Sequence, residues 1–265
     1  MTEIRVVVHG AAGRMGQVML QGLAGDPELN IVGAVDARSR GDSLPSPYGS
    51  GTIPYASDLG LLLHSVAANV VVDFSNAEAV LPAARAAAAR GVNLVVGTTG
   101  LAQETVAEIS ELATVHETGA IVAPNFALGA VLMMQMAKLA AKYFDYSEIF
   151  ELHHEQKADA PSGTSLSTAR LMLESRGKPF KQATTQKETL AGTRGGSLGG
   201  IAIHSVRLPG FMAHQEVVLG GLGQTLSIRH DTTGRDCYVP GVILAVKKVV
   251  NIKGLIYGLD TLLGF

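Results

Sequence analysis

The chain has 265 residues, 47% of them hydrophobic, which is enough for a sizeable core and corresponds to roughly two domains. Its 21 basic and 23 acidic residues give a formal net charge of −2 without long runs of like charge, so nothing favours binding to nucleic acid or to an anionic membrane. The single Cys237 rules out an internal disulfide, and Glu3 and Arg5 interrupt the apolar core that a signal peptide would need. We therefore expect a cytoplasmic protein.

Apolar strands alternate with helices over the first half of the chain. Continuous runs of Val and Ile between helices are typical of a parallel sheet that is covered on both faces. The pattern predicts a doubly wound, Rossmann-like α/β domain. We expect strands over 4–9, 31–36, 68–74, 92–96 and 119–123, helices over 14–24, 77–90 and 102–115, and an irregular loop over 39–54.

The first strand runs into a turn that reads GAAGRMG. Its GxxGxxG spacing departs from GxGxxG, but small residues at a helix start still let backbone amides approach a pyrophosphate. Such turns also occur for packing reasons alone. An acid at the end of the second strand strengthens the coenzyme interpretation, because it would accept hydrogen bonds from an adenosine ribose. The predicted coenzyme contacts here are Gly10, Ala11, Ala12, Gly13, Arg14, Met15, Asp36 and Arg38.

The coenzyme itself is left open by the residues that follow the second strand. Asp36 repels a 2′-phosphate and favours NADH, whereas Arg38 can pair with that phosphate or stack on the adenine. The sequence therefore predicts NADH or NADPH as the coenzyme.

Two further loops follow strands of the predicted sheet, at the carboxyl ends where open α/β sheets bind ligands. Gly, Pro and Asn also dominate ordinary turns, so each loop has a purely structural alternative. The predicted coenzyme contacts in them are Gly97, Thr98 and Thr99, and then Ala123, Pro124, Asn125 and Phe126.

The stretch from Glu151 to Ser165 reads ELHHEQKADAPSGTS and gathers groups that can transfer protons or bind anions. His153 and His154 would end a strand with side chains on opposite faces, Lys157 would follow on a loop, and the SGT would precede a helix with free amides. Each feature alone is more often structural, as a core histidine, a solvated lysine or a simple cap. Their combination favours an active site.

The chain then changes character. After an expected helix over 128–143, strands over 148–152, 201–207, 217–219 and 225–230 cluster without alternating helices. This clustering predicts a second, α+β domain with a mostly antiparallel sheet. Arg207 lies on one of these strands and could bind a substrate carboxylate, but an arginine flanked by apolar strand residues more often forms a structural ion pair, which is our interpretation. The apolar stretch 126–141 contains Gln135 and Lys138, so it reads as a buried helix and not as a membrane span.

The stretch around the two histidines matches HHxxKxDAPSGT, and the chain thereby resembles the 4-hydroxy-tetrahydrodipicolinate reductases. GTTG at 97–100, NF at 125–126 and HSVRLPGFMAHQEV at 204–217 extend the resemblance over essentially the whole chain. It implies an NAD(P)H-dependent reductase of lysine and diaminopimelate biosynthesis that acts on a small dicarboxylate. It further implies a homotetramer assembled through the second domain and no metal.

The resemblance also implies roles and domain limits. His153 and Lys157 would be catalytic, and His154, Gly163 and Thr164 would bind substrate. We expect a coenzyme domain over 1–126 completed by 236–265, a substrate domain over 127–235, and closure about the two connections. The alternatives are another two-domain dehydrogenase, which would not explain the histidine-rich stretch, and a nucleotide-binding sensor that lost catalysis.

Overall fold

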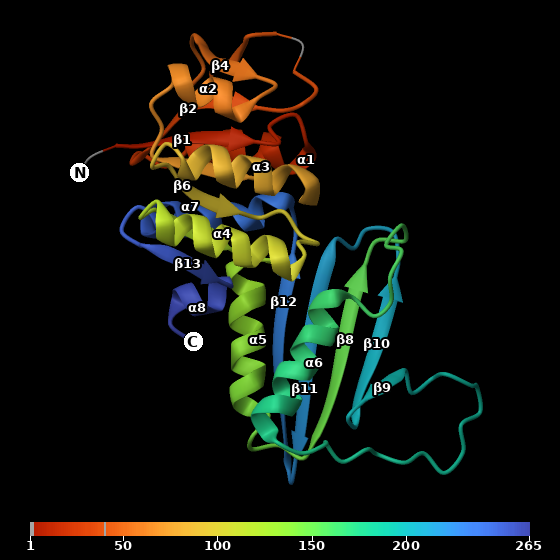
Figure 1. Cartoon of the computed structure of the whole chain (residues 1–265). Coiled ribbons are helices and arrows are strands. Elements are labelled where there is room, and N and C mark those ends of the chain that lie inside the picture. Colours follow the sequence, from red (N-terminus) through yellow and green to blue (C-terminus); the bar gives the residue numbers. More distant parts are fainter. Residues whose placement is uncertain (1–2, 40) are drawn as a thin grey trace. The chain divides into compact units, whose positions relative to one another are not determined.

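The computed structural model describes residues 3–39 and 41–265, which form two compact units (Figure 1). The first unit runs to Leu128 and includes Arg235–Phe265, and the second unit is Gly129–Gly234. The chain therefore leaves the first unit once and returns to it, so two connections join the units.

An eight-stranded sheet forms the centre of the first unit, in the order β13-β7-β6-β5-β1-β2-β4-β3. Its pairs are parallel except for β3 with β4. The Val residues of β1 and β5 are fully buried, as strands covered on both faces require. The strands are β1 (Ile4–His9), β2 (Leu29–Val35), β3 (Ser43–Pro45), β4 (Thr52–Ala56), β5 (Val70–Asp73), β6 (Asn93–Val96), β7 (Gly119–Val122) and β13 (Gly254–Tyr257).

Helices cover both faces of this sheet, which confirms the predicted doubly wound fold (Figure 1). On one face, apolar residues of α2, α3 and α4 form a core with the strands, and α1 and α7 pack together elsewhere in the unit. Strand order reverses between β5 and β1, the position where such sheets bind ligands. The helices are α1 (Arg14–Ala24), α2 (Leu59–Ser65), α3 (Ala77–Ala88), α4 (Gln103–Val115), α7 (Val239–Val249) and α8 (Leu259–Leu263), with a 3₁₀ turn η1 (Arg235–Tyr238).

The expectation of an irregular loop over 39–54 was wrong. This segment contains β3 and the start of β4, which pair with each other, and β4 then pairs with β2 through Ala34 and Tyr55. The helix α2 that follows was not predicted either. Pro45 and Pro54 are turn signals in the sequence, and it is the tertiary pairing with β2 that selects extended structure here.

A five-stranded sheet forms the second unit, in the order β12-β11-β8-β10-β9. Only β8 and β10 pair in parallel, so the sheet is mostly antiparallel, as predicted. The helices α5 and α6 contribute to the core on one of its faces, where Ile149, Val217 and Leu219 are buried. The elements are α5 (Leu128–Ala140), β8 (Tyr146–His153), α6 (Gly163–Arg176), β9 (Gly196–Leu198), β10 (Ile201–Arg207), β11 (Ala213–Gly221) and β12 (Gln224–Thr232).

The apolar sequence of α5 predicts a buried helix, but one side of α5 is exposed. Met136 is 54% exposed and Leu139 is 59% exposed, because a helix that covers one face of a sheet buries only one of its own sides. Among the described helices, none is long and apolar enough to cross a membrane.

Candidate active site

The predicted coenzyme residues all follow strands of the first sheet at their carboxyl ends. Because these strands are parallel, the residues lie along the same edge of the sheet. Gly10–Gly13 connect β1 to α1, and Arg14 and Met15 are the first residues of α1. Asp36 and Arg38 follow β2, Gly97–Thr99 follow β6, and Ala123–Phe126 follow β7.

The glycine-rich turn is shaped so that a side chain would block it. Gly10 has φ +81°, and a Cβ there would lie 2.5 Å from the carbonyl oxygen of Phe74. A Cβ on Gly16 would lie 2.1 Å from the carbonyl oxygen of Gly10, so α1 can start directly against the turn only with glycine. Gly13 caps α1 without any side-chain hydrogen bond, so the first amides of the helix can bind a phosphate. This turn therefore fits a pyrophosphate.

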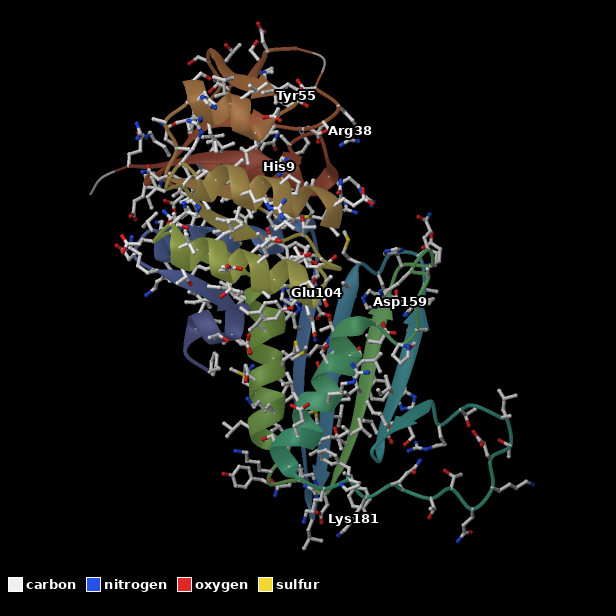
Figure 2. All side chains as sticks on the ribbon, in the orientation of Figure 1. His9, Arg38, Tyr55, Glu104, Asp159 and Lys181 are labelled. Atoms are coloured by element: carbon white, nitrogen blue, oxygen red, sulfur yellow. The ribbon has the colours of Figure 1, made fainter. Side chains whose placement is uncertain are left out.

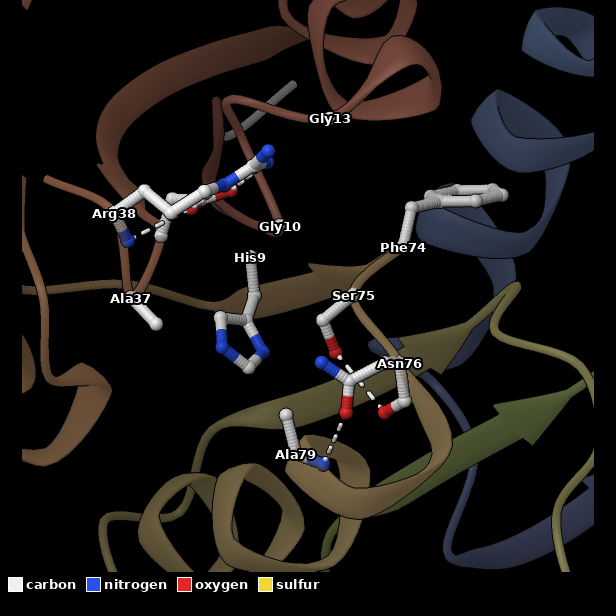
Figure 3. A pocket seen from close by; sticks show the side chains of 10 residues that line it. His9, Gly10, Gly13, Ala37, Arg38, Phe74, Ser75, Asn76 and Ala79 are labelled. Atoms are coloured by element: carbon white, nitrogen blue, oxygen red, sulfur yellow. Dashed lines mark hydrogen bonds and ion pairs between the residues drawn. The ribbon is translucent and has the colours of Figure 1, made fainter.

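Asp36 is 5% exposed and already accepts hydrogen bonds from its surroundings. The amide of Ala12 donates at 3.0 Å, and Arg38 donates from Nε at 2.9 Å and from Nη2 at 3.2 Å. The Arg38 hydrogen bond lowers the pKa of Asp36 against the opposing effect of burial, so the carboxylate is ionised at neutral pH and can accept from ribose hydroxyls. Gly10, Gly13, Asp36 and Arg38 line one cavity of about 260 Å³ (Figure 3).

The loops after β6 and β7 lie on the same edge but do not line that cavity. A Cβ on Gly97 would lie 2.2 Å from the ring of Phe74, and the Thr98 hydroxyl donates to Asp73 Oδ1 at 2.6 Å. Asn125 accepts from the amide of Ala127 at 2.9 Å, and Phe126 is buried against Phe74. These contacts hold the two loops tightly against the sheet.

The histidine-rich stretch follows the second sheet. His153 is the last residue of β8, and Lys157 lies in the connection to α6. The helix starts slightly earlier than predicted, since Ser162 is its cap and Gly163 and Thr164 are its first two residues. Their amides therefore belong to the first turn, where helices leave N–H groups for ligands.

A buried carboxylate orients His153. Glu151 is 0% exposed, and its Oε2 hydrogen-bonds His153 Nδ1. Arg207 binds the same carboxylate with both terminal nitrogens, at 3.0 Å to Oε2 and 2.8 Å to Oε1. With Nδ1 engaged, Nε2 is the ring nitrogen that can face a substrate. Arg207 is thus the structural ion-pair partner that the sequence suggested.

The pKa values of Glu151 and of His153 are both lower than usual, for different reasons. Burial alone would raise the pKa of Glu151, but hydrogen bonds from Arg207 and Ser205 outweigh it, and the pKa lies below its usual value. Burial also lowers the pKa of His153, more than the neighbouring Glu151 carboxylate raises it. Burial is the main cause of this shift, and His154 is exposed beyond the strand end.

Hydrogen bonds hold Lys157 in the connection between β8 and α6. Its Nζ donates to Asp159 Oδ1 at 2.6 Å, and the Asp159 carbonyl accepts from Arg207 Nη2 at 2.6 Å. Asp159 therefore links Lys157 to the ion pair of Glu151 and Arg207 behind His153. Figure 2 labels Asp159 beside the end of β8. An ammonium on this loop can attract a dicarboxylate and donate a proton.

Buried hydroxyls and an amide anchor the start of α6 to β11. Ser165 Oγ donates to Gln215 Oε1 at 2.7 Å, and Gln215 Nε2 donates to Thr168 Oγ1 at 2.9 Å. Ser162 Oγ accepts from the Ser165 amide, which leaves the preceding amides of Gly163 and Thr164 for a ligand. The predicted carboxylate site is therefore built on a fixed helix start.

Two buried carboxylates, Glu151 in the second unit and Asp73 in the first, were not singled out from the sequence. Glu151 stands two residues before His153, so strand alternation places both on the same face of β8, and this signal could have been used. Asp73 ends β5 and hydrogen-bonds His9, 64 positions away, and no local pattern predicts that contact.

A doubly wound domain with a glycine-rich turn and a strand-end acid, joined to a domain with acid–base groups beside a helix start, defines a two-domain, pyridine-nucleotide-dependent oxidoreductase. Over residues 4–126 the chain matches the family described as dihydrodipicolinate reductase, N-terminus, and over residues 129–263 it matches dihydrodipicolinate reductase, C-terminus. The chain belongs to the dihydrodipicolinate reductase family, which confirms the resemblance.

Individual relatives agree with this assignment. The 4-hydroxy-tetrahydrodipicolinate reductase of Dehalococcoides mccartyi is 51% identical over 263 residues, with 99% of each chain covered. That of Moorella thermoacetica is 50% identical over 265 residues, with 99% of this chain and 98% of the relative covered. The structure of a dipicolinate-bound dihydrodipicolinate reductase from Paenisporosarcina sp. TG-14 is 40% identical, has a TM-score of 0.89, and covers 98% of this chain and 99% of its own.

Proposed function

We propose that the chain reduces 4-hydroxy-tetrahydrodipicolinate to tetrahydrodipicolinate with NADH or NADPH and with loss of water, a step of lysine and diaminopimelate biosynthesis. The observation that carries this proposal is the placement of His153, Lys157 and the first amides of α6 on consecutive parts of a single chain segment. Relatives that are about half identical over their full length have this activity in their names.

The first unit holds the coenzyme, which supplies the hydride when it is bound. The turn over Gly10–Met15 binds the pyrophosphate with backbone amides, and Asp36 accepts from the ribose. The loops over Gly97–Thr99 and Ala123–Phe126 support the nicotinamide half. Arg38 already pairs with Asp36, which offsets part of its attraction for a 2′-phosphate, so we expect NADH to be at least comparable to NADPH.

The second unit holds the dicarboxylate. The amides of Gly163 and Thr164 bind one carboxylate of the ring, and His154 contacts the substrate from its exposed position. Hydride addition to an unsaturated ring leaves negative charge that a proton must neutralise. Lys157 is the cationic donor at neutral pH, and His153, held by Glu151, exchanges protons through Nε2.

The assembly and the location of the protein are further parts of this proposal. We infer a homotetramer that forms through the second unit, closure about the two connections during the reaction, and a cytoplasmic location. The charged pairs on the strands of the second sheet, such as Glu216 with Arg229, suit a wet interface between copies. Sedimentation that shows a stable monomer would contradict the tetramer.

The decisive experiment supplies the purified chain with the condensation product of pyruvate and aspartate semialdehyde and follows oxidation of NADH and of NADPH. We expect both coenzymes to be oxidised only when the product is present. A failure with both coenzymes would exclude the activity. A hundredfold or greater preference for NADPH, roughly 3 kcal/mol, would contradict the expectation about coenzyme choice alone.

A further inference from the structure

His9 is a titratable residue at the coenzyme edge that the site described above does not use. It is the last residue of β1, directly before Gly10, and lies where the strand order reverses. Its ring faces the cavity that also contains Ala37, Arg38 and Ala79 (Figure 3). A second cavity of about 330 Å³ shares His9, Ala37 and Ala79 as lining residues, so His9 forms part of the wall common to both.

A buried carboxylate fixes the orientation of this imidazole. Asp73, 0% exposed, stands opposite His9 in the pairing of β1 with β5, and its Oδ2 lies 2.5 Å from His9 Nδ1. The hydroxyl of Ser75 lies 3.0 Å from both carboxylate oxygens, and the hydroxyl of Thr98 donates to Oδ1. Because Nδ1 is engaged, Nε2 is the nitrogen available to a ligand in the cavity.

The protonation state of His9 decides what Nε2 can do. With the proton on Nδ1, a neutral ring offers Nε2 as an acceptor, which suits a ribose hydroxyl. An imidazolium offers an N–H and a positive charge, which suits a 2′-phosphate. Imidazole is the side chain whose ordinary chemistry allows a change of charge near neutral pH.

The other charged groups around this cavity make that difference matter. Asp36 and Asp73 are acidic, and Asp58 adds a third carboxylate in the adjoining cavity. Arg38 is the neighbouring cation, and it is paired with Asp36. Tyr55 stays neutral, because burial and the Asp36 carboxylate raise its pKa. A dianionic phosphate therefore enters a region of net negative charge, and protonation of the imidazole reduces that negative charge by one.

We propose that His9 is a specificity-determining residue for the coenzyme, whose neutral form favours NADH and whose protonated form favours NADPH. The affinity for NADPH relative to NADH then rises as the pH falls. This inference rests on the use of a pyridine nucleotide and not on the identity of the reduced substrate. The second unit has no part in this coenzyme choice, because the residues involved all lie in the first unit.

The test is coenzyme binding without any substrate, followed by nucleotide fluorescence between pH 8.5 and pH 6.5. We expect the ratio of the NADH Kd to the NADPH Kd to rise about tenfold over this range, the scale of one added charge contact. A phosphate ester takes up its own proton near pH 6, which would lower the ratio, so the range stays above that value. Because substrate is absent, the result is independent of whether the proposed reaction occurs.

His9→Gln is the critical variant, and His116→Gln is its matched control. His116 is exposed at the end of α4, just before β7 starts, and therefore lies at the opposite edge of the sheet. We expect His9→Gln to abolish the rise of the ratio and His116→Gln to retain it. An unchanged pH dependence in folded His9→Gln would overturn the proposal.

A second measurement keeps the proposal testable if His9→Gln does not fold. NMR titration of the ring protons of His9 in the wild-type chain compares the pH midpoint with NADPH and with NADH. We expect the pH midpoint of His9 to be higher with NADPH bound than with NADH bound. Equal midpoints with the two coenzymes would refute the role of His9.

Discussion

In each unit a fully buried carboxylate hydrogen-bonds the Nδ1 atom of a histidine, but the remaining partners of the two carboxylates differ. Besides His9, Asp73 accepts hydrogen bonds from the neutral hydroxyls of Ser75 and Thr98. Glu151 is bound by the guanidinium of Arg207 through two hydrogen bonds. The charge of Glu151 is therefore compensated permanently, whereas His9 is the group beside Asp73 that can become cationic.

This difference suits two kinds of work. Where Arg207 already balances the carboxylate, burial keeps His153 neutral at pH 7, and the ring can exchange protons with a substrate. Where no guanidinium binds the carboxylate, protonation of the imidazole changes the net charge of the cavity, and the ring can respond to the charge of a ligand. The comparison thus separates a group tuned for proton transfer from a group suited to ligand discrimination.

The largest expected effect comes from neutralising each carboxylate in turn. Glu151→Gln leaves the buried guanidinium without its counter-charge and should lower the free energy of unfolding by about 3 kcal/mol, the lower end for a broken buried pair, because Arg207 is 19% exposed. Asp73→Asn keeps hydrogen bonds to hydroxyls that can rotate, so we expect a loss of about 1 kcal/mol. Urea unfolding at pH 7 measures both.

A double variant sharpens this test. Glu151→Gln combined with Arg207→Leu removes the uncompensated charge, so we expect it to be more stable than Glu151→Gln alone. Equal losses for Glu151→Gln and Asp73→Asn would show that Arg207 is not what distinguishes the two carboxylates.

The next effect concerns catalysis in the second unit. His153→Ala and Lys157→Ala should each lower kcat by about a hundredfold or more, the usual scale of acid–base contributions, with coenzyme affinity near that of wild type. Thr164→Ala should act mainly through KM, because it perturbs carboxylate binding at the start of α6. Steady-state kinetics and nucleotide fluorescence separate these outcomes.

The exposed Lys178 provides a matched control for Lys157. Lys178→Ala should leave kcat unchanged. Near-normal kcat in both His153→Ala and Lys157→Ala, with intact folding, would place the catalytic groups elsewhere.

The smallest effect is the pH dependence of stability. The lowered pKa of His153 means that the unfolded chain binds its proton more readily, so stability is lost as the pH falls below about 6.5. His230, whose pKa burial also lowers, acts in the same direction. Glu151 adds its loss only at more acidic pH, below about 4.5, where the carboxylate of the unfolded chain takes up its proton.

Urea unfolding at pH 7 and pH 5.5 measures this dependence. His153→Gln should reduce the loss between the two values, because it removes a group whose pKa is lowered by burial. The control His116→Gln should not change it. An unchanged dependence in His153→Gln would mean that His153 is not held neutral by its burial.

Local patterns in the sequence determined the fold class, the glycine-rich turn, Asp36 and the histidine-rich stretch. Periodicity of 3.6 or 2 residues and strand-end turns depend on neighbours a few positions away, so they are visible without a structure. Elements whose boundaries depend on pairing were predicted less well, as β3 and β4 show.

The tertiary structure alone decided which buried groups meet. His9 and Asp73 are 64 positions apart, and Glu151 and Arg207 are 56 apart, because parallel pairing of β1 with β5 and of β8 with β10 brings them together. A buried charge is stable only when its partners are in place, and those partners come from whichever strands the fold makes adjacent. The long-range partners, Asp73 for His9 and Arg207 for Glu151, are beyond the reach of local sequence patterns.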